Sequence, residues 1–295
     1  MAENPNKLKL ALPKGSLQER TLDLFEKAGF NIYVSSRGLR PTSDDSDLDL
    51  YLIRAQEVAQ YISSGFIDCG ITGLDWAQGH IENLVDLAEL PFSRASNNPT
   101  KWVLVVPENS DIQSVQDLEG KRIATEGIDI TKKYLAEKGV NCHLEFSWGA
   151  TEVKVPDLVD AIVDVTETGS SIRANNLRIV DTLLTSFPHF YASKQAEQDA
   201  WKKAKMERVI MMLKASMLAQ NKVGLKVNLP KDQLDLVVDK LPSLRRPTVS
   251  PLLGEENWVA VETIIDESVA RKIIPDLKSH GGEGIIEYPL NKIVL

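Results

Sequence analysis

One stretch of the sequence combines side chains that favour phosphate binding. A buried strand is expected over Ala161–Val165, because this run is almost continuously apolar. Glu167-Thr-Gly-Ser-Ser171 follows it and leads into a helix start. Gly169 permits a tight turn, and the hydroxyls beside it lie next to helix N-terminal N–H groups, which bind anions. Acidic neighbours such as Asp164 can accept ribose hydroxyls or hold Mg²⁺ against a pyrophosphate. An ordinary strand-to-helix turn capped by Ser and Thr is the alternative interpretation.

Three further strand ends carry charged side chains. Lys14 follows the strand expected at Leu8–Leu12 and precedes a glycine and a capped helix start, a setting that suits an anion. Arg54 ends an apolar strand, where α/β sheets place ligand-binding groups. Asp75 follows another strand in the same strand–loop–helix order. The alternatives are a solvated lysine, an ion-paired arginine and a helix-capping aspartate.

Other motifs exclude several kinds of chemistry. The sequence contains neither G-x-x-x-x-G-K-[ST] nor G-x-G-x-x-G, which disfavours a P-loop kinase and a Rossmann dehydrogenase. The four histidines show no metal-ligand spacing and no Ser/His/Asp order, which disfavours a structural zinc site and hydrolase chemistry. Glu152 and Lys154 lie in a polar loop between two sheet segments, where a solvated charge pair is the alternative to a functional role.

Composition limits the class of protein further. The chain has 295 residues, of which 43% are hydrophobic and 26% charged, as in a globular protein of two or three domains. Its formal net charge of -8 argues against a nucleic-acid partner, which needs a basic surface. No apolar run approaches the ~18 residues that cross a bilayer. The first residues lack the basic stretch and apolar core of a signal peptide. We therefore expect a cytoplasmic protein with no membrane partner.

Strand and helix patterns alternate along the first two thirds of the chain. They predict largely parallel α/β sheets in two successive series, the second starting near Lys101. One long amphipathic helix is expected over Lys194–Leu218. From Val223 onward the order becomes strand, helix, strand, strand, helix, strand, which is the ferredoxin-like βαββαβ order. The patterns therefore predict an α/β protein with a separate C-terminal domain.

Separated motifs in this chain resemble a known enzyme family. Their order is that of ATP phosphoribosyltransferase, the first enzyme of histidine biosynthesis: Leu12-Pro-Lys-Gly-Ser-Leu17, Gly70-Ile-Thr-Gly-Leu-Asp75, Arg122-Ile-Ala-Thr125 and Asp160–Ser171. The resemblance extends into the C-terminal domain, which marks the long form with a regulatory module: Pro247-Thr-Val-Ser-Pro-Leu252, Trp258-Val-Ala-Val261 and Gly284–Val294. It implies two periplasmic-binding-protein-like lobes with the active site in their cleft. The implied reaction joins adenine N1 of ATP to C1 of phosphoribosyl pyrophosphate (PRPP), releases pyrophosphate and requires Mg²⁺.

The resemblance also implies roles for individual residues. The implied catalytic residues are two cations for polyphosphate charge and two carboxylates near the ribose: Lys14, Arg54, Asp164 and Glu167. The implied PRPP-binding residues are Thr166, Thr168, Gly169, Ser170 and Ser171. The implied nucleotide-binding residues are Leu12, Gly73, Asp75 and Glu152. The inhibitor L-histidine is expected at Asn228, Leu244, Thr248 and Gly284. No metal ligand is assigned, since Mg²⁺ is expected to be held mainly by substrate phosphates.

The same resemblance implies how the chain is divided. Catalytic lobe I is expected to comprise residues 1–99 and 187–215, lobe II residues 100–186, and the histidine-binding regulatory domain residues 216–295. A homo-oligomer, dimeric or hexameric, is also implied. The competing hypotheses are a solute-binding or effector-sensing module of the same architecture and a catalytically silent paralogue. The first leaves the Glu167–Ser171 loop unexplained, and the second is disfavoured by the presence of Lys14, Asp164 and the Thr168–Ser171 loop.

Overall fold

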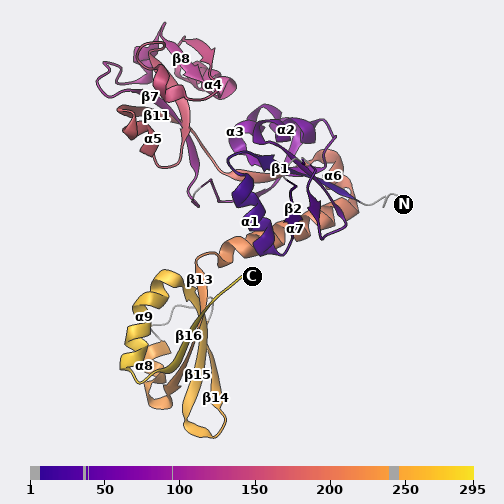
Figure 1. The fold of residues 1–295 in the computed structure, drawn as a ribbon, viewed down its shortest axis with the longest axis vertical. Helices are drawn as coiled ribbons and strands as arrows, with labels where there is room; N and C mark the ends of the chain where they lie inside the picture. Colours follow the sequence, from indigo (N-terminus) through magenta and orange to yellow (C-terminus); the bar gives the residue numbers. More distant parts are fainter. Residues whose placement is uncertain (1–6, 36–37, 39, 95, 239–245) are drawn as a thin grey trace. The chain divides into compact units, whose positions relative to one another are not determined.

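The computed structural model describes residues 7–35, 38, 40–94, 96–238 and 246–295, drawn as a ribbon in Figure 1. The chain divides into two compact units. The first comprises the residues up to Leu22 together with Ile32–Met206 and holds two sheets. The second comprises Asp23–Asn31 and Glu207–Leu295 and holds one sheet of four strands.

The first sheet has the strand order β4-β1-β5-β12-β6. Its strands β1 (Leu8–Lys14), β4 (Leu48–Arg54) and β5 (Cys69–Gly73) run parallel. β12 (Pro188–Ser193) runs antiparallel to β5 and to β6 (Leu84–Glu89). β6 therefore points the same way as β1, β4 and β5, and β12 alone is reversed in this sheet. The expectation of a largely parallel sheet holds except at β12, which enters the sheet from a later part of the chain in the opposite direction.

Helices pack on this sheet through apolar side chains at helical spacing. In α2 (Ala55–Ser63) the side chains of Val58 and Ile62 are fully buried and join a core cluster with Tyr191 of β12. Burial contributes roughly 1.5–3 kcal/mol for each aliphatic side chain of this size. The other elements of this region are α1 (Gln18–Ala28), β2 (Ile32–Tyr33), β3 (Thr42–Ser43), α3 (Leu74–Ala77), the 3₁₀ helix η1 (Gln78–Asn83) and α6 (Lys194–Gln198).

The second sheet has the strand order β11-β7-β10-β8-β9. Its strands are β7 (Thr100–Pro107), β8 (Arg122–Thr125), β9 (His143–Phe146), β10 (Ala161–Thr166) and β11 (Leu177–Ser186). β8, β9 and β10 run parallel, whereas β7 is antiparallel to both of its neighbours. Its helices are α4 (Ile128–Lys138), α5 (Ser170–Ala174) and the 3₁₀ helices η2 (Val115–Leu118) and η3 (Thr151–Lys154). The predicted strands at Leu177–Val180 and Thr182–Thr185 form one continuous β11, with bulges between Ile179 and Asp181 and between Thr182 and Leu184.

The chain crosses twice between these two sheets. It leaves the first sheet after β6 and enters the second at β7 through residues 90–99. It returns from β11 through Phe187 into β12. The two crossing segments, although far apart in sequence, are joined where Leu90 N–H donates to the carbonyl of Pro188 at 2.8 Å.

The helix expected over Lys194–Leu218 is wrong in one respect, because the structure breaks it at Asp199. The first part is α6, and the second is α7 (Ala200–Ala219). Asp199 has an extended backbone, φ -78° and ψ 115°. Its carboxylate accepts from the backbone N–H groups of Trp201 and Lys202 at 3.0 and 2.9 Å. Asp199 thus caps a new helix, which is the preferred use of aspartate at a helix start.

The second unit contains the predicted ferredoxin-like arrangement. Its elements are β13 (Lys222–Pro230), the 3₁₀ helix η4 (Lys231–Gln233), α8 (Leu234–Val238), β14 (Thr248–Leu252), β15 (Glu255–Asp266), α9 (Glu267–Ser279) and β16 (Glu283–Pro289). The strand order is β14-β15-β13-β16, with antiparallel neighbours throughout. Alternate residues of β13 pack against α9, whose Ala270, Ile273 and Leu277 are buried. The expected fold class is therefore confirmed.

Among the helices of the described residues, none combines the length and the apolar character needed to cross a membrane.

Candidate active site

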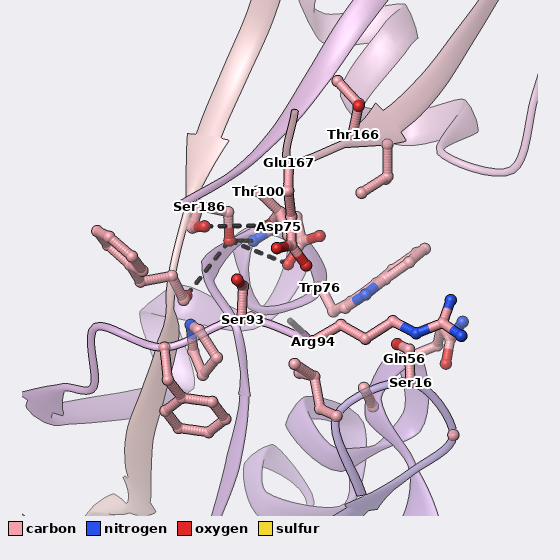
Figure 2. Close-up of a pocket in the computed structure, with 18 of the residues that line it drawn as sticks. Ser16, Gln56, Asp75, Trp76, Ser93, Arg94, Thr100, Thr166, Glu167 and Ser186 are labelled. Carbon is pink, nitrogen blue, oxygen red and sulfur yellow. Dashed lines mark hydrogen bonds between the residues drawn. The ribbon is translucent and has the colours of Figure 1, made fainter. Parts of the chain in front are cut away.

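A cavity of about 640 Å³ lies within the first unit and takes side chains from both sheets. Figure 2 shows it with many of its lining residues as sticks. The first sheet contributes the segments that follow β1, β4 and β5. The second sheet contributes the end of β10 and the start of α5. Both crossing segments also reach the cavity, through Phe92–Arg94 and Ser186–Pro188.

Parallel pairing brings the predicted cations together. β1 and β4 pair so that Lys14 lies opposite Arg54 in the register, and both side chains are exposed and line the cavity. Gly73, at the end of β5, lines it as well. Carboxyl ends of parallel strands meet at one edge of a sheet, so the position of these residues follows from the topology.

The Glu167–Ser171 loop has a backbone that depends on glycine. Gly169 has φ +71°, and a Cβ there would approach Nη1 of Arg173 at 2.9 Å. Gly169 N–H donates to Oγ1 of Thr166 at 2.8 Å, and the hydroxyl of Thr168 donates to Oγ of Ser170 at 3.1 Å. The loop residues that line the cavity are Thr166, Glu167, Thr168, Ser170 and Ser171. The structure thus places a cluster of hydroxyl groups in the cavity that also contains Lys14 and Arg54.

The carboxylates in the cavity have protein donors. Trp102 Nε1 donates to Asp75 Oδ2 at 2.8 Å, and the Ser186 hydroxyl donates to Asp75 Oδ1 at 3.2 Å. Glu126 accepts from the side-chain amide of Gln56 at 3.0 Å. Glu167 accepts from the hydroxyl of Ser96 at 3.2 Å. In Figure 2, dashed hydrogen bonds join Asp75 to Ser186.

Unlike its carboxylates, the cations in the cavity lack a hydrogen-bond partner among the described residues. Lys14, Arg54 and Arg94 line the cavity, and in the described part of the chain none of them has a hydrogen bond or an ion pair with a protein acceptor. All three side chains are exposed, so water can satisfy their N–H donors and a ligand can take the place of that water. The cavity therefore offers an anion three cations without a protein acceptor in the described chain, whereas each of its carboxylates already accepts a hydrogen bond from a neutral side chain.

Asp75 does not act as the helix cap that the sequence left open. Gly73 occupies the N-cap position of α3, and no side chain caps that helix. Burial raises the pKa of Asp75, while hydrogen bonds from Trp102, from the backbone of Trp76 and from Ser186 act in the opposite direction. The Trp76 and Trp102 rings pack edge-to-face with centroids 5.5 Å apart. Asp75 thus contacts both places where the chain passes between the sheets, because Trp102 lies on β7, just after the first crossing, and Ser186 ends β11, just before the second.

Asp164 and Glu152 are not among the residues that line the cavity. The pKa of Asp164 is raised to about 6, chiefly by burial. The charges of Glu152 and Glu126 also raise it, whereas the hydrogen bond from the Val165 N–H lowers it. The hydroxyl of Ser171 donates to Glu152 Oε1 at 2.5 Å. Gly169 is the buried residue of the loop and does not line the cavity. Leu12 is only 1% exposed and lies in the core, so the structure does not bring its side chain to the cavity.

Several cavity residues were not predicted from the sequence. Glu126 directly follows β8, so the rule that placed Arg54 at a strand end applies to it as well. Arg94 and Ser186 belong to the crossing segments, which carry no recognisable motif. Trp76 follows Asp75 on α3 and is half-buried. The residue pattern within one segment cannot predict such residues, because their place in the cavity depends on which strands pair in the folded protein.

The expected histidine-binding residues lie in the second unit. Asn228 and Gly284 are neighbours on β13 and β16, since a Cβ on Gly284 would meet Asn228 Nδ2 at 3.3 Å. Thr248 is exposed on the edge strand β14, opposite Glu262 of β15. Leu244 lies outside the described residues. The structure therefore brings Asn228 and Gly284 together and places Thr248 on a different strand pair.

Comparisons with known proteins identify the family. The family model described as ATP phosphoribosyltransferase matches residues 54–215. A second model, described as the C-terminal domain of HisG, matches residues 219–292. The chain belongs to the ATP phosphoribosyltransferase family. Its form is the long one, since the C-terminal domain is present together with the catalytic part.

Full-length relatives agree with this ATP phosphoribosyltransferase assignment. The chain is 55% identical over 294 residues to the ATP phosphoribosyltransferase of Prosthecochloris aestuarii, with 100% of both chains covered. It is 52% identical over 287 residues to that of Thermodesulfovibrio yellowstonii, covering 97% of this chain and 98% of the relative. Among solved structures, an ATP phosphoribosyl transferase (HisG:HisZ) complex from Thermotoga maritima matches with a TM-score of 0.60 and 28% identity. That match covers 70% of this chain and 98% of the other.

Membership of the ATP phosphoribosyltransferase family fixes the reaction. The protein is a pentosyltransferase of histidine biosynthesis, and the substrates of this family are ATP and PRPP. The expectations of family, fold class, enzyme class and reaction are thereby confirmed. The solute-binding module has no support from the full-length relatives, which all carry an enzyme name.

Proposed function

We propose that the cavity binds both substrates, with the Thr166–Ser171 loop on the 5-phosphate of PRPP. The observation that carries this proposal is the pairing of a hydroxyl-rich loop with cations that have no protein acceptor in the described chain. Backbone N–H groups and hydroxyls bind a phosphate dianion well. Lys14 and Arg54, on the other sheet, are assigned to the polyphosphate charge of pyrophosphate or ATP.

Asp164 and Glu167 are proposed to act near the ribose. Glu167 lines the cavity and accepts from the Ser96 hydroxyl at Oε2, while its Oε1 has no hydrogen-bond donor among the described residues. Asp164 lies three residues before Glu167, half-buried in β10. Carboxylates at these positions accept ribose hydroxyls and stabilise the positive charge that develops on the ring in the transition state.

Asp75, Gly73, Glu152 and Leu12 are proposed to belong to the nucleotide side of the site. Gly73 and Asp75 line the cavity directly. Glu152 would act through Ser171, to which it is hydrogen-bonded, and Leu12 by packing beneath β1. These four residues would therefore shape the site rather than take part in bond changes.

The chemistry places modest demands on proton transfer. Adenine N1 supplies an electron pair to C1 of the ribose, and the C1–O bond to pyrophosphate breaks with its electrons leaving on that oxygen. The nucleophile carries no proton, so no strong general base is needed. Rate acceleration then rests on orienting two substrates and on stabilising charge in the leaving pyrophosphate.

Mg²⁺ is proposed as the metal of the reaction, held mainly by substrate phosphates. The described residues contain no group of three or more His, Cys, Asp or Glu side chains placed to hold a metal by themselves. Single carboxylates in the cavity, Glu167 above all, fit an ion that takes most of its ligands from phosphate oxygens and water. When bound, Mg²⁺ neutralises charge on the departing pyrophosphate.

The last domain is proposed to bind L-histidine and to inhibit the enzyme. Asn228 and Gly284 lie together and are candidates for one part of that site, and Thr248 for another. We also propose the domain limits 1–99 with 187–215, 100–186, and 216–295, a cytoplasmic location, and a homo-oligomer, dimeric or hexameric. The Thermotoga maritima relative was solved as a complex, which supports an assembled enzyme.

One assay tests these proposals together. Near-ultraviolet absorbance is followed with ATP, PRPP, Mg²⁺ and pyrophosphatase, with and without L-histidine. We expect a rise that needs both substrates and Mg²⁺ and is suppressed by histidine. Asp164→Ala should abolish the rise while histidine binding, measured by calorimetry, survives. A rise that histidine does not alter would remove the regulatory proposal and leave the catalytic one intact.

A further inference from the structure

Arg94 enters the cavity from the crossing segment between β6 and β7, not from a strand end. The residues on its N-terminal side are buried, Phe92 at 2% exposed and Ser93 at 0%. Phe92 N–H donates to the Leu90 carbonyl at 2.7 Å, and Ser93 N–H donates to the Ser96 carbonyl at 2.8 Å. The side chain of Arg94 itself is exposed and lines the cavity. Hydrogen bonds thus anchor the backbone just before Arg94, while its side chain stays exposed in the cavity.

The segment that carries Arg94 is fixed to elements of both sheets. Leu90 N–H is bonded to the Pro188 carbonyl at the start of β12. Asn97 accepts from Nη2 of Arg20 on α1 at 3.0 Å. Ser96 donates to Glu167 in the phosphate loop at 3.2 Å. Arg94 is therefore positioned by the catalytic region as a whole, including the loop that we assign to PRPP.

The guanidinium of Arg94 lacks a protein acceptor. The described residues provide no hydrogen bond or ion pair for it, although the cavity contains three carboxylates. Those of Asp75, Glu126 and Glu167 each accept from another side chain. Figure 2 shows the Arg94 side chain extended, ending in the part of the view that contains Gln56 and Ser16. A planar guanidinium with five N–H donors matches the oxygens of a phosphate pair in a bidentate manner.

We infer that Arg94 binds a diphosphate unit of a substrate, together with Lys14 and Arg54. This inference rests on the proposed function, which gives the 5-phosphate of PRPP to the hydroxyl loop. The diphosphate unit then belongs to the cationic part of the cavity. Two sources share this chemistry, the pyrophosphate of PRPP and the terminal phosphates of ATP. In the first case Arg94 stabilises the charge of the leaving group as the bond to C1 breaks.

The test compares the full-length enzyme with three variants. Arg94→Gln removes the charge, and Arg94→Lys keeps the charge but loses the planar fork. Arg40→Gln is the control, because Arg40 is exposed, pairs with Asp49 and does not line the cavity. Binding of inorganic pyrophosphate with Mg²⁺ is measured by calorimetry. We expect Arg94→Gln to weaken it about 10- to 100-fold, as for loss of a charged hydrogen bond, with a smaller loss in Arg94→Lys.

Steady-state kinetics then identify the source of the diphosphate. A rise in KM for PRPP with KM for ATP unchanged assigns Arg94 to the leaving pyrophosphate. A rise in KM for ATP, with the affinity for AMP unchanged, assigns it to the triphosphate. Arg94→Gln behaving as Arg40→Gln in pyrophosphate affinity and in both KM values would overturn the inference. So would a wild-type enzyme that does not bind pyrophosphate.

The outcome also separates this inference from the proposed function. A wild-type protein that binds pyrophosphate through Arg94 but gives no ATP- and PRPP-dependent turnover would contradict the proposed function alone. Arg94 has no protein acceptor in the described chain, so we expect the melting temperature of Arg94→Gln to equal that of the wild type. If the melting temperature of Arg94→Gln falls, the pyrophosphate affinity of Arg94→Lys is compared with that of the wild type instead. A diphosphate still distinguishes the point charge of lysine from the planar guanidinium of arginine.

Discussion

The indole N–H of Trp102, in the second sheet, donates at 2.8 Å to the carboxylate of Asp75, on the helix α3 that directly follows β5 of the first sheet. Trp102 lies on β7, directly after the first crossing, and is 1% exposed. Asp75 is the second residue of α3 and also accepts from the hydroxyl of Ser186, at the second crossing. One carboxylate therefore joins both connections through which the chain passes from sheet to sheet.

A double-mutant cycle measures the strength of this link. Trp102→Phe and Asp75→Ala each remove the bond, and we expect a coupling free energy of about 1.5–3 kcal/mol, as for hydrogen bonds to charged groups. The Trp102 N–H stabilises the ionised form of Asp75, so the loss in Trp102→Phe should be larger at pH 7 than at pH 4. Urea unfolding gives the four free energies. Additivity within about 0.5 kcal/mol would show that the bond carries no net stability.

Asp164 gives a second prediction, in which the sign of the pH dependence is the test. Its pKa is about 6 in the folded protein, above the ordinary value for an aspartate, chiefly because of burial. The folded state then binds this proton more tightly than the unfolded state does. The associated stability is fully present below about pH 4 and is lost as the pH rises through 6.

The variant Asp164→Asn should remove this loss. We expect it to match the wild type near pH 4 and to exceed it near pH 8, by on the order of 1–2 kcal/mol after allowance for solvent screening. Turnover should fall sharply at the same time, because a ribose-facing carboxylate is gone. Thermal unfolding at the two pH values decides the matter. Equal stability differences at both would show that Asp164 is not the titrating group.

A substitution at Gly169 tests whether the backbone conformation of the loop matters for PRPP binding. Gly169→Ala places a Cβ at φ +71°, 2.9 Å from Arg173 Nη1. We expect a loss of about 1–2 kcal/mol in stability, because alanine is strained at this positive φ, and an increase in KM for PRPP, because that strain lies in the proposed phosphate-binding loop. Gly120→Ala is the matched control, with φ +73° and nothing within 4 Å of the added atom. Its stability should fall similarly with KM unchanged. A normal KM in Gly169→Ala would argue against loop binding of PRPP.

A lysine on α7 provides a test of how this helix is anchored. Lys205 is 13% exposed and donates to Asp45 and Asp47 at 2.8–2.9 Å. Lys205→Met leaves two adjacent carboxylates without their cation, and we expect a loss of about 2–4 kcal/mol in chemical unfolding. Lys203→Met, on the same helix, breaks an exposed pair with Glu197 and should cost less than 1 kcal/mol. Similar losses in both variants would contradict this account.

Local patterns predicted the elements and the strand-end residues well. β1, β4, α4 and the C-terminal βαββαβ order follow from apolar spacing and glycine stops, and Lys14, Arg54 and the Glu167–Ser171 loop were found because strand ends are readable in a sequence. β6 and β12 were not predicted. β12 returns to the first sheet after the whole second sheet, and β6 pairs with it there. Local residue patterns do not show which distant strands will pair.

The same limit applies to the candidate site. Asp75 was found by its position, but its bonds to Trp102 and Ser186 depend on two crossings that meet in space. Arg94 had no signal, because the crossing segment contains neither a motif nor a periodic pattern. The helix break at Asp199 was missed for a different reason, since the apolar spacing continues through a residue that is also a good cap.

The strand order of the first sheet has a consequence for synthesis on the ribosome. β6 is complete at Glu89, but in the described sheet its neighbour is β12, which ends at Ser193. One edge of the first sheet therefore stays unpaired while about a hundred further residues are translated. Unpaired strand edges are prone to associate with other chains. The second sheet, whose strands are consecutive from β7 to β11, can close before the first one does.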